Sequence, residues 1–143
     1  MLSASSLNLM RTPTTLEDGS SVYNSTIVIT CYLRYVINPD RLAEFEHYAR
    51  AWMQLVEKYG GTHHGYFMPG ESPPSAAFSF PGVGAEGPDN IAIALFSFPS
   101  VEAYEEYRRK VADDPECRAV TNYYNETKCF IKYERTFMRP VNK

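Results

Sequence analysis

Two hydrophobic periodicities divide the central part of the chain into strands and helices. Apolar residues at every second position, or in short unbroken runs, are typical of strands, and apolar residues three or four positions apart are typical of helices. On this basis we predict strands at 27–37, 62–68, 90–98 and 128–137. We predict a long helix up to about residue 59, a second helix after Ser100 and a short third helix after Asp114.

Cap and breaker residues support these boundaries. Asn38 is followed by Pro39, and Asp114 is followed by Pro115. Each pair supplies a side-chain cap and then a residue whose missing N–H costs nothing in the first helical turn. The pair 60–61 (GG) ends the long helix, because glycine accepts the left-handed cap conformation without a Cβ clash.

The predicted order is strand, helix, strand, strand, helix pair, strand. This order indicates an α+β fold of the ferredoxin-like βαββαβ type, with a four-stranded antiparallel sheet covered by helices on one face. The other face is left bare, and a large exposed apolar patch marks an interaction site. We therefore expect a homodimer, the simplest closed assembly.

The domain is expected to span 26–140, after a disordered N-terminal extension at 1–25 that is rich in Ser and Thr. A mitochondrial presequence is the alternative for this extension, but Glu17 and Asp18 have the wrong charge for one. The loop 70–89 is rich in Pro, Gly and Ser. Such long connections are usually lids, partner contacts or disordered segments.

Composition narrows the possible partners. The 143 residues carry a formal net charge of −3, which argues against nucleic-acid binding, and no apolar run is long enough to span a membrane. The three cysteines match neither a metal motif nor a disulfide framework. We expect free, buried thiols in a cytoplasmic protein with no metal and no cofactor.

Four segments in order resemble the NIPSNAP family, which belongs to the dimeric α/β-barrel superfamily. They are 30–35 (TCYLRY), 60–67 (GGTHHGYF), 92–100 (AIALFSFPS) and 133–135 (YER). The resemblance covers about residues 27–140 and implies a protomer whose sheet packs on a partner's sheet to form a barrel. Relatives in the superfamily include cofactor-free monooxygenases, haem-degrading enzymes, small-molecule isomerases and ligand binders, and fold alone does not choose among them.

Arg34 lies in the middle of an apolar strand, where a permanent charge needs a partner. One interpretation is a clamp for an anionic substrate or an enolate. The favoured interpretation is a structural pair with Glu134, because the first and last strands are antiparallel neighbours in this topology.

His63 and His64 are adjacent on the second predicted strand. Imidazole titrates near neutral pH, so either residue could act as a general base, with Arg34 stabilising an oxyanion. The alternative is that one histidine satisfies a buried hydrogen bond while the other faces solvent or the partner. Neighbouring strand residues point to opposite faces, so the two are not expected to serve one pocket.

If the strands are regular, several polar side chains share one face of the sheet. The cluster contains Thr30, Tyr32, Arg34, His64 and Tyr66. Trp52 would cover the pocket from the first helix, although core packing is its commoner role. Convergent polar groups in an apolar setting are the usual form of a ligand site.

Three functions fit these residues. The favoured one is a homodimeric protein that binds a small molecule in a pocket near the sheet, through Tyr32, Arg34, Trp52, His64 and Tyr66. The second is a cofactor-independent enzyme acting on an aromatic or polyketide-like substrate through His63, His64 and Arg34. The third is a scaffold whose long loop contacts a partner.

Overall fold

The computed structural model describes residues 14–15, 21–22, 28–74 and 77–143. The strands are β1 (Thr14–Thr15), β2 (Ser21–Val22), β3 (Ile29–Ile37), β4 (Thr62–Phe67), β5 (Ile91–Phe98) and β6 (Phe130–Met138). The helices are the short 3-10 turn η2 (Pro39–Arg41), α2 (Leu42–Lys58), α3 (Val101–Val111) and α4 (Pro115–Thr127). From β3 onwards, the strands and the helices α2, α3 and α4 follow the predicted order.

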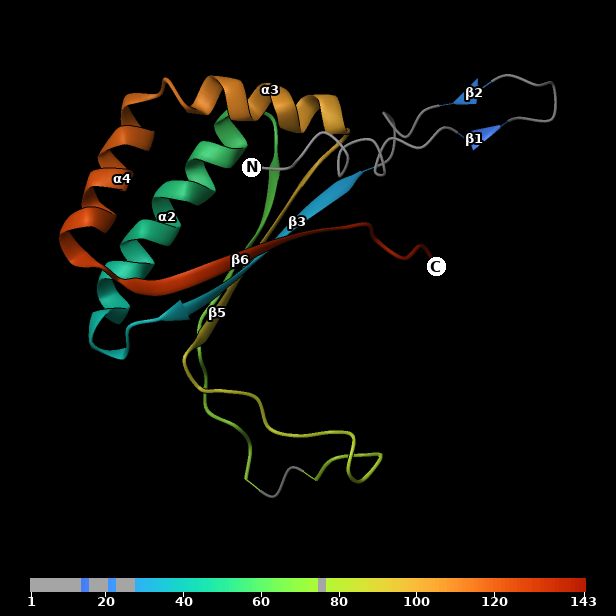
Figure 1. Cartoon of the computed structure of the whole chain (residues 1–143), viewed down its shortest axis with the longest axis vertical. Coiled ribbons are helices and arrows are strands. Elements are labelled where there is room, and N and C mark those ends of the chain that lie inside the picture. Colours follow the sequence, from blue (N-terminus) through green and yellow to red (C-terminus); the bar gives the residue numbers. More distant parts are fainter. Residues whose placement is uncertain (1–13, 16–20, 23–27, 75–76) are drawn as a thin grey trace.

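The main sheet has four antiparallel strands in the order β4-β5-β3-β6, which confirms the predicted α+β, ferredoxin-like plan. The three helices lie together on one side of it (Figure 1). We call this side of the sheet the helix side and the opposite side the open side. β1 and β2 pair separately as a two-stranded ladder.

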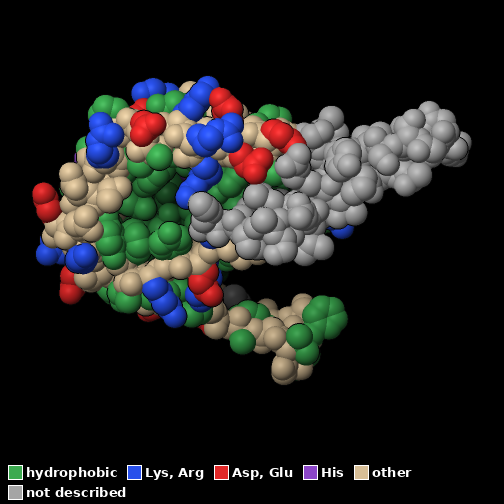
Figure 2. Space-filling model, turned by 45° about the horizontal axis from the view of Figure 1, so that its top comes forward, with side chains coloured by type: hydrophobic (Ala, Val, Ile, Leu, Met, Phe, Trp, Pro, Cys, Tyr) green, Lys and Arg blue, Asp and Glu red, His purple; other side chains and the backbone are tan. Residues whose placement is uncertain are grey.

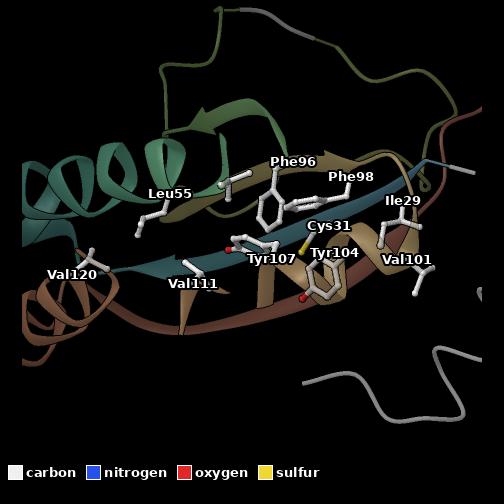
Figure 3. Close-up of a cluster of buried hydrophobic side chains, with 11 residues drawn as sticks. Ile29, Cys31, Leu55, Phe96, Phe98, Val101, Tyr104, Tyr107, Val111 and Val120 are labelled. Carbon is white, nitrogen blue, oxygen red and sulfur yellow. The ribbon is translucent and has the colours of Figure 1, made fainter. Parts of the chain in front are cut away.

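The core lies between the helix side and the helices. Alternate residues of β3 and β5 point into it, including Cys31, Phe96 and Phe98. Figure 3 shows these side chains directed towards Tyr104 and Tyr107 of α3. The period of two along the strands and the period near 3.6 along α3 therefore meet in one layer, as the sequence pattern predicts.

The predicted caps form hydrogen bonds. The Asn38 side chain accepts one from the Asp40 N–H, and the Ser100 hydroxyl accepts one from the Ala103 N–H at 3.0 Å. Asp114 caps α4 and also accepts hydrogen bonds from the Lys58 ammonium and the Tyr59 hydroxyl. These bonds lower the pKa of Asp114 to about 2 and tie the start of α4 to the end of α2.

Two boundary predictions need correction. The third helix is not short, because α4 continues for 13 residues to Thr127. Lys128 was expected to begin the last strand, but it ends α4 in the left-handed conformation, with φ of 49°. The chain reverses at this residue, and β6 starts at Phe130.

A bulge in β4 overturns the expectation that Tyr66 shares a face with His64. The β4–β5 pairing shifts between His63 and Gly65, and Gly65 takes a φ of +117°, a conformation that suits glycine. Because of the extra residue, His63 and Tyr66 lie on the same side of the sheet although they are three positions apart. Their rings stack with centroids 5.1 Å apart on the helix side.

The segment between β4 and β5 projects away from the helices (Figure 1). It exposes three apolar side chains, those of Phe78, Phe80 and Val83. The predicted disorder of 1–25 lies mostly outside the described residues, of which only β1 and β2 belong to that stretch. Among the described residues, no helix has both the length and the apolar content that crossing a bilayer requires.

Candidate functional site

The structure does not bring the predicted site residues into one pocket. Tyr32 and Arg34 lie on the open side, because they alternate with the buried residues of β3. His64 joins them there through its contact with Ser97. Trp52 and Tyr66 lie on the helix side with the core clusters. The predicted ligand set is therefore divided by the sheet.

Arg34 lies opposite Glu134 in the β3–β6 ladder, as the topology predicts. Their side chains form an ion pair with a nitrogen–oxygen distance of 3.4 Å. Both side chains are substantially exposed, at 33% and 66%. An exposed pair of this kind contributes roughly 0–1 kcal/mol, so it orients Arg34 more than it stabilises the sheet.

His64 belongs to a short hydrogen-bonded chain across three strands of the open side. Its Nε2 lies 2.8 Å from the Ser97 hydroxyl, which lies 2.8 Å from the Thr30 hydroxyl. Ser97 is almost fully buried beneath these two neighbours. No carboxylate is recorded in hydrogen-bonding contact with His64 among the described residues, so the chain has no third member that would orient the imidazole.

His63 is turned towards the helices by the bulge. Its Nδ1 accepts a hydrogen bond from the Gly65 N–H at 2.9 Å, and its buried Nε2 meets no partner among the described residues. Burial lowers the pKa of His63 to about 4, although the charge of Glu57 opposes that shift. The imidazole is therefore neutral at pH 7 and is a weak base.

A cleft opens on the helix side, between β6 and the three helices. Its inner part has a volume of about 100 Å³ and adjoins a more open groove of about 430 Å³. Figure 2 shows this hollow lined by hydrophobic side chains, with Lys and Arg side chains at its edge. The aromatic residues that line the inner part include Tyr48, Trp52, Phe96, Tyr104, Tyr107 and Tyr133.

Burial keeps the deeper phenol and thiol groups of the cleft neutral, beside the charged Arg108 and Arg135. Burial raises the pKa of Tyr48 and Tyr107 well above the usual value, so both phenols keep their protons. Burial also raises the pKa of the Cys31 thiol to about 12, against the opposing charges of Arg135 and Arg108. Cys31 is therefore unreactive at neutral pH, and the cleft presents hydroxyls and apolar surface.

The predicted site residues include Trp52 but none of the other side chains that line the inner part of this cleft. Arg135 lies there because it pairs with Leu33, which points to the helix side of β3. Alternation along β6, counted from Glu134 opposite Arg34, would have found it. Arg108 follows the buried Tyr107 on α3, at the edge of the inner stripe.

Metal binding has no support from the described ranges, in which no three His, Cys, Asp or Glu side chains converge to hold an ion. The cleft lining contains Cys31 and no histidine or carboxylate. What the cleft can do chemically is bind an apolar or aromatic molecule and donate hydrogen bonds to it.

A four-stranded antiparallel sheet covered on one side by three helices defines an α+β protein of the ferredoxin-like class. The NIPSNAP family profile matches residues 32–143, and the chain belongs to that family. No curated protein matches the sequence.

Solved structures share the fold at low identity. A NIPSNAP-like domain protein from Burkholderia xenovorans is 17% identical, with a TM-score of 0.57 over 81% of this chain and 87% of its own. A NIPSNAP family protein from Agrobacterium tumefaciens is 18% identical, with a TM-score of 0.59 over 81% and 88%. A putative antibiotic biosynthesis monooxygenase from Nitrosomonas europaea is 5% identical, with a TM-score of 0.54 over 84% and 96%.

Proposed function

We propose that this protein is a homodimer that binds a small molecule in the cleft on the helix side. The observation that carries the proposal is the cleft itself, which is walled by aromatic rings and open to the surface. Ligand sites are typically concave, mostly apolar and supplied with a few polar groups. The buried indole N–H of Trp52 meets no acceptor at hydrogen-bonding geometry among the described residues, although the Tyr48 hydroxyl lies nearby. A bound ligand would supply one.

The open side supports the dimer part of the proposal. Ile91, Ile93 and Leu95 of β5 form its centre and are only half buried. Apolar side chains around them are exposed, including Phe67 at 54% and Met138 at 45%. A second copy of the chain would cover this face by the twofold pairing that most homodimers use.

Ligand binding is tested by thermal unfolding with a panel of aromatic and apolar small molecules. A ligand that binds only the folded state raises Tm as its concentration exceeds Kd. Trp52 is the single tryptophan, so the same ligand should change the intrinsic fluorescence. Leu33→Phe narrows the cleft and should reduce both responses, whereas Leu42→Phe, at an exposed position outside the cleft, should leave them unchanged. A panel that changes neither signal would remove this proposal.

The catalytic assignment of His63, His64 and Arg34 stays a prediction. None of the three lines the cleft, and the sheet separates His63 from the other two. A role for His64 would have to operate on the open side, within the proposed dimer interface. The cleft therefore favours ligand binding over histidine chemistry.

A further inference from the structure

Two arginines from different elements meet at the same cleft. Arg108 comes from α3 and Arg135 from β6, and both line its inner part. Arg135 Nη1 lies 3.5 Å from the Tyr104 hydroxyl, and its guanidinium stacks over Phe137 at 5.4 Å. Both charges act on Tyr104, opposing the rise of its pKa that burial causes. The two guanidinium groups therefore place positive charge at the same part of the cleft.

Among the described residues, no ion pair neutralises these charges at the cleft. Within the described ranges, no carboxylate lies within the 4.0 Å ion-pair distance of Arg108 or Arg135, and the cleft lining contains none. By contrast, the neighbouring Arg109 pairs with Glu106 at 2.6 Å. The whole chain has a net charge of −3, so a positive edge above an aromatic cleft is a local departure from its surroundings.

The polar groups of the cleft also share one chemical character. Guanidinium groups and an indole N–H donate hydrogen bonds and accept none. Buried phenols keep their protons and can donate as well. A site built from donors above aromatic walls is complementary to a planar or apolar body that carries acceptor oxygens.

We propose that the ligand of this cleft is an organic anion, an aromatic or apolar carboxylic acid whose carboxylate lies between Arg108 and Arg135 while its body packs against Trp52. This inference rests on the proposed function, since it specifies the ligand class of the same cleft. The Arg34–Glu134 pair has no part in it, because that pair lies on the other side of the sheet.

The test compares 4-phenylbutyrate with its neutral isostere 4-phenylbutyramide. Trp52 is the single tryptophan, and its indole absorbs at longer wavelengths than phenyl or tyrosine rings, so it can be excited selectively in the presence of either probe. Titration monitored by Trp52 fluorescence gives Kd for each probe. The acid should bind at least about tenfold more tightly than the amide, as expected for charge-assisted hydrogen bonds.

Substitution identifies the groups responsible. Arg108 is exposed, so Arg108→Gln should fold normally and weaken binding of the acid by about tenfold while changing that of the amide less than about twofold. Arg135→Lys keeps the positive charge but loses the two parallel N–H donors of the guanidinium group, and it should also weaken binding of the acid. Arg109→Gln, one residue along α3, is the matched control and should change neither Kd.

Each outcome decides one of the two proposals. Equal binding of the acid and amide, or an Arg108→Gln variant that binds the acid as the wild type does, would overturn the organic-anion inference and leave the cleft as a ligand site. If neither probe binds at millimolar concentration in the wild type, the organic-anion inference fails, and the small-molecule panel alone decides whether the cleft binds another class of ligand.

Discussion

The two sides of the main sheet differ in how far the chain's own helices cover them. On the helix side, large aromatic residues such as Tyr35 and Phe98 are nearly fully buried by the chain's own helices. On the open side, the β5 residues Ile91, Ile93 and Leu95 are only partly buried, and the polar residues pair across strands. One side has a core with a cleft cut into it, and the other has a surface that nothing in the described chain covers.

This difference indicates that the two sides are suited to different kinds of binding. Shape and hydrogen-bond donors for a small molecule are found on the helix side, whereas the open side offers extended apolar surface suited to a protein partner. The bulge at Gly65 maintains the division within β4, because it holds His63 with the helices and His64 on the open side. Adjacent residues thereby contribute to different surfaces.

The largest expected effect is on the free energy of unfolding, and it is measured by making the same Phe→Ala substitution on each side of the sheet. Phe98 is 1% exposed on the helix side and Phe67 is 54% exposed on the open side. Phe98→Ala should lower the free energy of unfolding by about 3–5 kcal/mol, because it leaves a cavity in the core. In the free protomer, Phe67→Ala should lower it by less than about 1 kcal/mol, so the comparison is made at a protein concentration low enough for the proposed dimer to dissociate. Urea unfolding measures both, and equal losses would contradict the division.

Self-association tests the open side directly. Ile93→Glu places a charge at the centre of this side, where dimerisation would bury it, and should raise the dimer dissociation constant by roughly a hundredfold or more. Sedimentation over a range of concentrations measures the shift. Asn122→Glu adds the same charge on an exposed position of α4 and should leave the assembly unchanged. A wild-type chain that sediments as a protomer would exclude the proposed interface.

The bulge in β4 allows a test in which the expected change in stability is smaller. A Cβ at Gly65 would meet only the Phe67 ring, at 3.8 Å, so the effect of Gly65→Ala comes from the backbone at φ +117°. Such a conformation is strained for alanine, and we expect a loss of roughly 1–3 kcal/mol in urea unfolding. Gly70 has open space and no positive φ, so Gly70→Ala is the control and should be close to neutral. Equal behaviour of the two variants would show that the bulge does not need glycine.

The fold was predictable because local signals and the global plan agree. Cap residues such as Ser100 and Asp114 mark helix starts, and alternation along β3 separates Cys31 from Arg34. The Arg34–Glu134 pair followed from strand order alone. Consistency across these levels is what lets a sequence specify its topology.

The candidate site was less predictable because one extra residue in β4 reverses the side on which later residues lie. Counting by twos from His64 placed Tyr66 on the open side, and the bulge places it on the helix side. The cleft also draws on α3 and β6, which are far from the 60–67 stretch in sequence. Only their packing shows that Arg108 and Arg135 meet.

The smallest expected effect concerns the protonation of His63. Its pKa is lowered from 6.5 to about 4 by burial, so between these two pH values the unfolded chain binds a proton that the folded chain does not. Stability should therefore fall as pH falls from 6.5 to 4, by about 1 kcal/mol, since solvent partly screens this half-buried group.

His63→Asn supplies the comparison for that pH dependence. Asparagine can still accept the Gly65 N–H bond but cannot become charged, so the variant should show a flatter stability profile over this range, whatever its absolute stability. Below pH 4 both proteins should lose stability together, because the bonds with Lys58 and Tyr59 lower the pKa of Asp114 from 3.8 to about 2, so the unfolded chain binds a proton at this carboxylate before the folded chain does. Unfolding free energies measured from pH 7 to pH 3 test this. Parallel profiles between pH 6.5 and 4 would show that His63 is not held neutral on the helix side.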